Sequence, residues 1–141
     1  GGITISAGRF AMPASWLAAL GAPFNTIRPE GLVQVNWQAW TKAETLNAKL
    51  TWLDAQSALA SIRPLGEYVM TVTGNPGTKL EVALNTTRGP LMLEGQGQWT
   101  ASQRFVFNGY ASAQAGSREA LTGLLSQMGR QEGERYRLGV F

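Results

Sequence analysis

The stretch of sequence that decides the fold covers residues 91–99 and reads Leu91-Met92-Leu93-Glu94-Gly95-Gln96-Gly97-Gln98-Trp99. Its odd positions are apolar or glycine, and its even positions are polar from Glu94 onward. Because successive side chains of a strand point to opposite faces, this alternation predicts a strand with one apolar and one polar face. Glycine weakens a strand unless the sheet bends there or another element approaches closely. Gly95, Gly97 and Gly109, all on the apolar side, therefore indicate a strongly curved sheet.

The same alternation recurs on both sides of this stretch. It covers residues 3–7, 33–37, 46–52, 68–73, 80–85, 105–111 and 136–140. Several of the turns between these stretches are short, as in Gly74-Asn75-Pro76-Gly77. Short turns join antiparallel neighbours, because a parallel pair needs a crossover of about a dozen residues or more. The sequence thus predicts a mainly β protein, a strongly curved antiparallel meander sheet in one domain over residues 1–141. A half-barrel or groove and a closed barrel share this alternation.

Two short helices interrupt the strand pattern, and the first is expected near residues 14–20. It ends before Gly21, which is a typical C-terminal stop. Helical spacing places Trp16, Leu17 and Leu20 on one face. A short helix that ends at a glycine accounts for this spacing.

The second helix is expected near residues 117–128. Ser117 is a candidate N-cap, Glu119 lies in the first turn, and Gly129 supplies the stop. Its apolar residues have the i, i+3, i+4, i+7 spacing of an amphipathic helix. They are Leu121, Leu124, Leu125 and Met128.

The composition excludes most enzyme chemistry. The chain has 141 residues and contains no histidine and no cysteine, so neither a Ser-His-Asp triad nor a Cys-His nucleophile can form. Zinc, haem and iron–sulfur sites of the common kinds lose their ligands for the same reason. The sequence also lacks a loop of clustered carboxylates for a hard cation. We therefore expect no catalytic residue, no metal site and no cofactor.

The nine carboxylates have ordinary structural explanations. Glu81 and Glu94 fall on the polar faces of neighbouring strands, where we expect them to face solvent. Asp54 follows a strand and is expected to form a turn. A pair of carboxylates acting as general acid and base is the enzymatic alternative.

The charge pattern argues against nucleic acid and against a membrane span. The net charge is +3, but its twelve Lys and Arg residues are scattered, whereas nucleic-acid binders concentrate them in a patch. The densest group, Arg130, Arg135 and Arg137, is interrupted by Glu132 and Glu134. No run of about 18 apolar residues occurs that could span a bilayer.

Four residues are candidate protein contacts: Trp40, Arg135, Tyr136 and Arg137. Trp40 breaks the strand alternation, and tryptophan is enriched in interface hot spots. The strand that begins at Ile3 and the strand around Tyr136 are expected at the two edges of the meander. Arg135 and Arg137 would protect that C-terminal edge by charge, as edge strands usually require. Alternatively, either edge could accept a strand from a partner.

The order and spacing of several phrases resemble the type II secretion system protein N family, GspN. The phrases lie at residues 63–68, 89–99, 105–111, 121–129 and 135–138. The resemblance covers most of the chain and is strongest over residues 62–140. It implies a non-catalytic accessory component of the bacterial machine that exports folded proteins.

The resemblance also implies a location and partners. Members of that family have one N-terminal helix in the inner membrane and a periplasmic bulk, so we expect this sequence to be a periplasmic fragment that lacks the anchor. The expected partners are the inner-membrane protein C and the outer-membrane secretin, protein D. An alternative comes from the sheet alone, because a curved sheet with an apolar face can hold a lipid or another apolar ligand.

Overall fold

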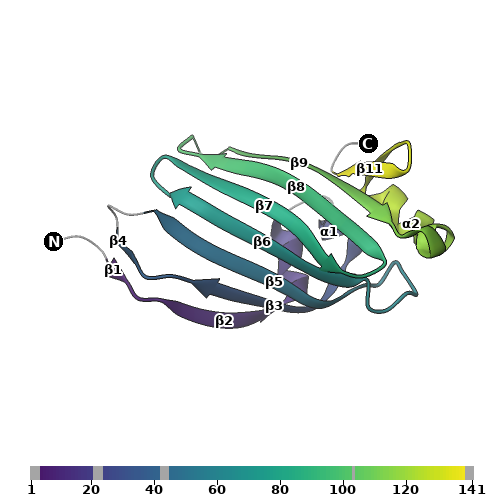
Figure 1. The fold of residues 1–141 in the computed structure, drawn as a ribbon, viewed down its shortest axis with the longest axis horizontal. Helices are drawn as coiled ribbons and strands as arrows, with labels where there is room; N and C mark the ends of the chain where they lie inside the picture. The colour runs from purple at the N-terminus through teal and green to yellow at the C-terminus, as the bar shows by residue number, and fades with distance from the viewer. Residues whose placement is uncertain (1–3, 21–23, 42–44, 103, 139–141) are drawn as a thin grey trace.

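The computed structural model describes residues 4–20, 24–41, 45–102 and 104–138. Within them, a nine-stranded antiparallel sheet has the order β10-β11-β9-β8-β7-β6-β5-β3-β2 (Figure 1). Its strands are β2 (Gly8–Pro13), β3 (Pro29–Trp37), β5 (Leu46–Ser57), β6 (Gly66–Asn75), β7 (Lys79–Arg88), β8 (Leu91–Thr100), β9 (Phe105–Ala113), β10 (Gly129–Glu132) and β11 (Arg135–Leu138). The predicted meander is confirmed. The sheet is open, with β2 and β10 at its edges, and does not close into a barrel.

Both ends of the meander differ from the prediction. A single strand over residues 3–7 was expected, but the structure has β1 (Thr4–Ile5), paired with β4 (Trp40–Thr41), and then β2. Ile3 lies outside the described residues. At the other end β10 was not expected, because its sequence, Gly-Arg-Gln-Glu, has no apolar alternation and follows a helix directly. The last strand ends at Leu138, beyond which the structure is not described.

The first predicted helix is present as the 3₁₀-helix η1 (Ala14–Leu20). Ala14 and Leu17 are buried, but Trp16 is 61% exposed, so the predicted face of Trp16 is wrong. A 3₁₀-helix has three residues per turn, which places positions 14 and 17 on the same side and turns position 16 outward. Gly21 and the Leu20 side chain lie outside the described residues. A short helix, α1 (Phe24–Ile27), follows and was not expected.

The second predicted helix is confirmed as α2 (Arg118–Met128), preceded by the short 3₁₀-helix η2 (Ala115–Ser117). All four predicted core positions are buried: Leu121, Leu124, Leu125 and Met128. Ser117 stands at the predicted N-cap position, although its side chain makes no capping hydrogen bond. The backbone N–H of Gly129 donates to the Leu125 carbonyl, and β10 begins at that glycine.

Helices α1 and α2 pack on the apolar face of the sheet, and Figure 1 shows α1 behind it. Ile27 of α1 and Leu124 of α2 join the core that the sheet contributes through buried residues such as Trp52, Tyr68 and Leu93. In the figure, α1 stands behind the middle of the sheet and α2 at the right-hand end, beside β11. The helices therefore cover the middle and one end of the apolar face.

The three glycines on the apolar face make room for one aromatic ring. Gly95 pairs with Gly109, and Gly97 pairs with Phe107. A Cβ atom on Gly95, Gly97 or Gly109 would lie 2.5, 2.9 or 2.7 Å from the Phe107 ring, respectively. These glycines, which the sequence pattern takes as a sign of curvature, leave the space that the Phe107 side chain of the neighbouring strand β9 occupies.

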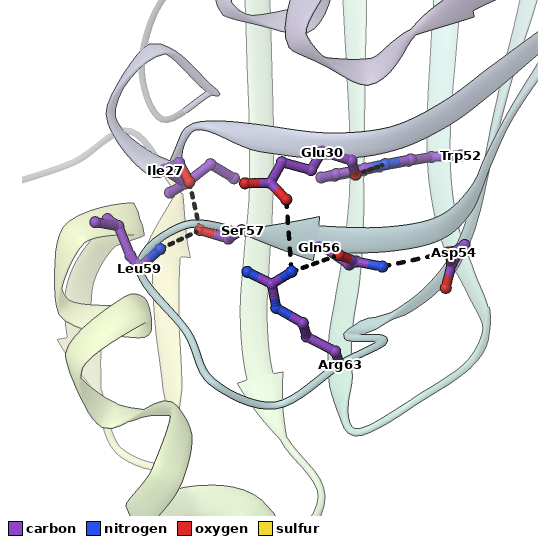
Figure 2. A network of polar contacts seen from close by, with 8 residues as sticks. All are labelled: Ile27, Glu30, Trp52, Asp54, Gln56, Ser57, Leu59 and Arg63. Atoms are coloured by element: carbon purple, nitrogen blue, oxygen red, sulfur yellow. Dashed lines mark hydrogen bonds and ion pairs between the residues drawn. The ribbon is translucent and has the colours of Figure 1, made fainter.

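A polar network ties the end of β5 to the beginning of β3 (Figure 2). The buried Ser57 hydroxyl donates to the Ile27 carbonyl and accepts from the Leu59 N–H at 3.1 Å. The Arg63 guanidinium donates to the Gln56 side-chain oxygen at 3.0 Å. These contacts hold the loop before β6 against the sheet, and each described member of the network has a structural role.

Asp54 belongs to this network and not to a turn. It lies inside β5, at a register shift between Trp52 and Ala55, with a φ of 50°. Its carboxylate accepts a hydrogen bond from Gln56 at 3.2 Å. In place of the expected turn the structure has a β-bulge, and the strand continues to Ser57, five residues beyond the apolar alternation of residues 46–52.

Burial of Tyr68 makes stability depend on alkaline pH. Its hydroxyl donates to the Leu91 carbonyl at 2.7 Å, and burial raises the pKa of Tyr68 far above its ordinary value. The unfolded chain loses this proton near pH 10, while the folded chain keeps it. The contribution of Tyr68 to the free energy of unfolding is therefore fully present below about pH 10. Above that pH the free energy of unfolding falls by up to about 1.4 kcal/mol per pH unit.

Urea unfolding from pH 8 to 11 measures this dependence. Tyr68→Phe is expected to remove the contribution of Tyr68 to the alkaline slope. At neutral pH the same change costs about 1–3 kcal/mol, because the Leu91 carbonyl loses its buried partner. An alkaline slope that is the same in both proteins would contradict the assignment.

Candidate interaction surfaces

One end of the apolar face is not covered by a helix. Figure 1 shows this end at the left, where the β6–β7 and β8–β9 turns lie. Pairing of the strands places a single cross-strand row there, which we call the end row. It consists of Leu46, Gly74, Leu80, Trp99 and Phe105. Trp99 is 43% exposed and Phe105 is 42% exposed, so large aromatic surface faces solvent at this end.

Aromatic side chains border this end of the face on two sides. The Trp99 and Phe105 rings lie 5.6 Å apart between centroids, and the Phe105 and Phe107 rings lie 6.2 Å apart. On the same face, toward the β2 edge of the sheet, the centroids of the Phe10 and Trp37 rings lie 5.8 Å apart. Smaller apolar residues such as Ala48, Val72 and Val82 lie between these groups in the next cross-strand row. The uncovered end is thus an apolar strip with an aromatic group at each side.

The covered part of the face has little free space. A cavity of about 50 Å³ lies between the helices and the sheet, with an entirely apolar lining that includes Leu17, Phe24, Leu50 and Met70. Pockets that hold drug-sized ligands measure about 300–1,000 Å³. The cavity under the helices is therefore far smaller than such a pocket.

Trp40 lies at the same end of the molecule as the end row. It belongs to β4 and pairs with Ile5 of β1, and it is half-buried. The indole N–H of the nearby Trp37 donates to the Ser6 carbonyl at 2.8 Å, which ties β3 to the segment between β1 and β2. The structure thus places Trp40 near the aromatic end, and its role as a protein contact stays a prediction.

The predicted edge at Tyr136 is not an edge. Strand β11 lies between β9 and β10, and Tyr136 is buried in the core. Arg135 and Arg137 point to the opposite, polar face, where their guanidinium carbons lie 3.7 and 5.8 Å from the centre of the Tyr110 ring. The expectation that these arginines protect a free edge is wrong, because β10 covers it. The role of the three residues as protein contacts stays a prediction.

Glu81 and Glu94, the two carboxylates considered as an acid–base pair, both lie on the polar face of the sheet. A shallow hollow there is lined mainly by Thr73, Glu81, Gln96, Gln98 and Asn108. Glu81 pairs with Lys79 at 3.3 Å, and Glu94 is exposed beside a second hollow. Both glutamates face solvent, as expected. No cluster of three potential metal-ligating side chains occurs among the described residues.

None of the helices in the described part of the chain has the length and hydropathy needed to cross a membrane.

The family model described as type II secretion system (T2SS), protein N matches residues 1–139. The searches of curated proteins and of solved structures gave no match.

Proposed function

This chain belongs to the type II secretion system protein N family, and on that basis we propose that it is a non-catalytic scaffold of the secretion machine. Membership of the family indicates a role in type II secretion. The proposal adds that the domain works in the periplasm as part of a protein anchored in the inner membrane. There it would bridge the inner-membrane platform and the outer-membrane secretin.

The observation that supports a scaffold is the aromatic surface at the end row. Trp99 and Phe105 are each more than two-fifths exposed, and no helix lies over that end of the sheet in Figure 1. Buried tryptophan and other aromatic side chains dominate the energetics of protein interfaces. A partner that covers the end row would remove this apolar surface from water, and Trp40 at the same end would extend the contact.

The proposed partners are the inner-membrane protein C and the secretin, protein D. Arg135 and Arg137, which stack on Tyr110, would give the polar face a second contact with them. The buried Tyr136 would position these two arginines from the core side. No cofactor or metal takes part in this function.

The double change Trp99→Ser and Phe105→Ser is expected to weaken binding to purified periplasmic segments of protein C or protein D. We expect at least a tenfold loss of affinity, because interface hot spots contribute about 2 kcal/mol or more. Isothermal calorimetry measures the affinity, and circular dichroism checks that the variant is folded. Trp16→Ser is the matched control, since Trp16 is 61% exposed but lies on η1, and it should bind like the wild type.

Two outcomes would contradict the proposal. One is equal binding by the double variant and the wild type. The other is no binding by the wild type together with normal secretion in a deletion strain. Native mass spectrometry of the purified domain addresses the apolar-ligand alternative: a co-purifying lipid that the double variant does not retain would favour a carrier over a scaffold.

A further inference from the structure

The two edges of the large sheet differ in how they are protected against pairing. Edge strand β10 has four residues, of which Arg130 and Glu132 are charged. Edge strand β2 has six residues, Gly8–Pro13, and Arg9 is its only charged side chain. Short length and charge are the usual means of preventing strand addition at an edge. The β10 edge has both, whereas the β2 edge has a single charge and the proline at its end.

The β2 edge also leaves apolar surface exposed. Phe10 pairs with Val35 and Met12 pairs with Val33, so both side chains lie on the apolar face of the sheet. The Phe10 side chain is 48% exposed, although its ring packs against Trp37. An additional strand beside β2 would continue the apolar face past Phe10 and cover that ring. It would also satisfy backbone groups at this edge that point away from β3.

The polar side of the same edge is cationic. Arg9 pairs with Asn36 of β3, which in turn pairs with Lys49 of β5, so the two cations lie in one cross-strand row. Both are exposed, and among the described residues neither forms an ion pair with a carboxylate. Opposite charges on neighbouring strands stabilise their pairing, while like charges disfavour it. A strand that adds here is therefore favoured if it places a carboxylate beside Arg9.

We propose that β2 accepts an extended segment of another polypeptide as a tenth strand of the sheet. The segment has apolar side chains at alternate positions, beside Phe10 and Met12, and an aspartate or glutamate beside Arg9. Main-chain hydrogen bonds supply the affinity in this mode of recognition, and the alternate side chains supply the specificity. This inference concerns a surface different from the end row and does not depend on which partner the scaffold binds.

A second copy of this chain fits the edge less well. Strand β2 contains no carboxylate, so pairing of two β2 strands brings two Arg9 side chains into one ribbon without a countercharge. Strand β10 supplies Glu132, but Glu132 already pairs with Arg137 at 3.9 Å and lies in a strand of only four residues. The charges of the edge therefore favour a foreign segment over self-association.

Synthetic peptides test the proposal on the intact domain. The probe is a peptide of about eight residues that alternates valine with threonine and carries one central glutamate, which is long enough to cover β2. Its control has lysine in place of glutamate. At peptide concentrations up to about millimolar, the glutamate peptide is expected to slow hydrogen exchange of amides in β2 and not in β10. The lysine peptide should have a smaller effect.

Charge reversal at the two edges makes the test specific. Arg9→Glu is expected to lower the affinity for the glutamate peptide by about three- to tenfold and to raise that for the lysine peptide. Arg130→Glu, the matched change on β10, should alter neither affinity. Both side chains are exposed, so both variants should keep the melting temperature of the wild type.

Three results would overturn the proposal. The first is no slowing of exchange in β2 with either peptide. The second is slowing that is strongest in β10 or at the end row. The third is a concentration-dependent dimer, seen by sedimentation, that Arg9→Glu disrupts, because it would show that β2 pairs with its own copy. The double change Trp99→Ser and Phe105→Ser distinguishes this inference from the proposed function. If that variant loses binding to proteins C and D but still binds the glutamate peptide, the two surfaces act independently.

Discussion

Replacing Trp52 with alanine is expected to lower the free energy of unfolding by about 3–5 kcal/mol, the usual cost of removing a large aromatic side chain from a core. The Trp52 side chain is 6% exposed, and its ring lies 5.6 Å from the Tyr68 ring. Its indole N–H donates to the Glu30 carbonyl at 2.9 Å. Alanine would leave a cavity and remove a hydrogen bond that joins β5 to the start of β3. Urea unfolding followed by circular dichroism measures the loss.

A second tryptophan provides the control for this prediction. Trp16 is 61% exposed, so Trp16→Ala should change the free energy of unfolding by no more than about 0.5 kcal/mol, as is usual for surface sites. Equal losses at the two positions would contradict the placement of Trp52 in the core. The comparison is informative because both residues lie on an apolar face in the sequence pattern.

Gly89→Ala is expected to destabilise the protein by about 2–6 kcal/mol. Gly89 has a φ of 123°, a conformation that costs a residue with a Cβ about 1–3 kcal/mol. A Cβ atom there would also lie 2.2 Å from the Cα of Gly66, and relieving such a clash between backbones costs about another 1–3 kcal/mol. The two segments approach because the Leu91 N–H donates to the Leu65 carbonyl at 3.0 Å. Thermal unfolding followed by circular dichroism measures the effect.

The matched glycine is Gly123, in the interior of α2. Outside its chain neighbours and the adjoining backbone of α2, no atom lies within 4 Å of the position that its Cβ would take. A helix interior favours alanine over glycine by about 0.5–1 kcal/mol. Gly123→Ala is therefore expected to stabilise the protein by about that amount. An unchanged or higher melting temperature for Gly89→Ala would contradict the close approach of Gly89 to Gly66, and a lower one for Gly123→Ala would contradict the open space beside Gly123.

The strands and the second helix were predictable because their signals are local. A period of two places Leu91, Leu93 and Trp99 on one face, and the spacing of Leu121, Leu124 and the other apolar residues of α2 marks one helix face. Strand β10 has no such signal, because its sequence, Gly-Arg-Gln-Glu, contains no apolar side chain that could mark one face. Without β10, the sequence pattern predicts β11 as the edge strand. Arg135 and Arg137 are therefore expected at a free edge, whereas in the structure β10 pairs with their strand.

The candidate surfaces were less predictable than the strands. Trp40 was identified from its break in the alternation, and the structure places it near the uncovered end. Trp99 and Phe105 were assigned to an apolar strand face, and nothing in their local pattern separates them from Trp52. All three residues satisfy the same alternation. What separates them is which part of the face the helices cover, and those helices lie far away in the chain.

The amino-acid pattern alone therefore specifies the antiparallel meander, the apolar face and the helix over residues 118–128, because side-chain direction repeats with the local backbone period. Which half of the apolar face is buried, and which strands remain at the edges, depends on contacts between distant segments. Ile27 and Leu124 reach the sheet from opposite ends of the chain, and no local period records where they dock. For this protein, the exposed aromatic end row and the free edge of β2 are consequences of that docking and of the strand order.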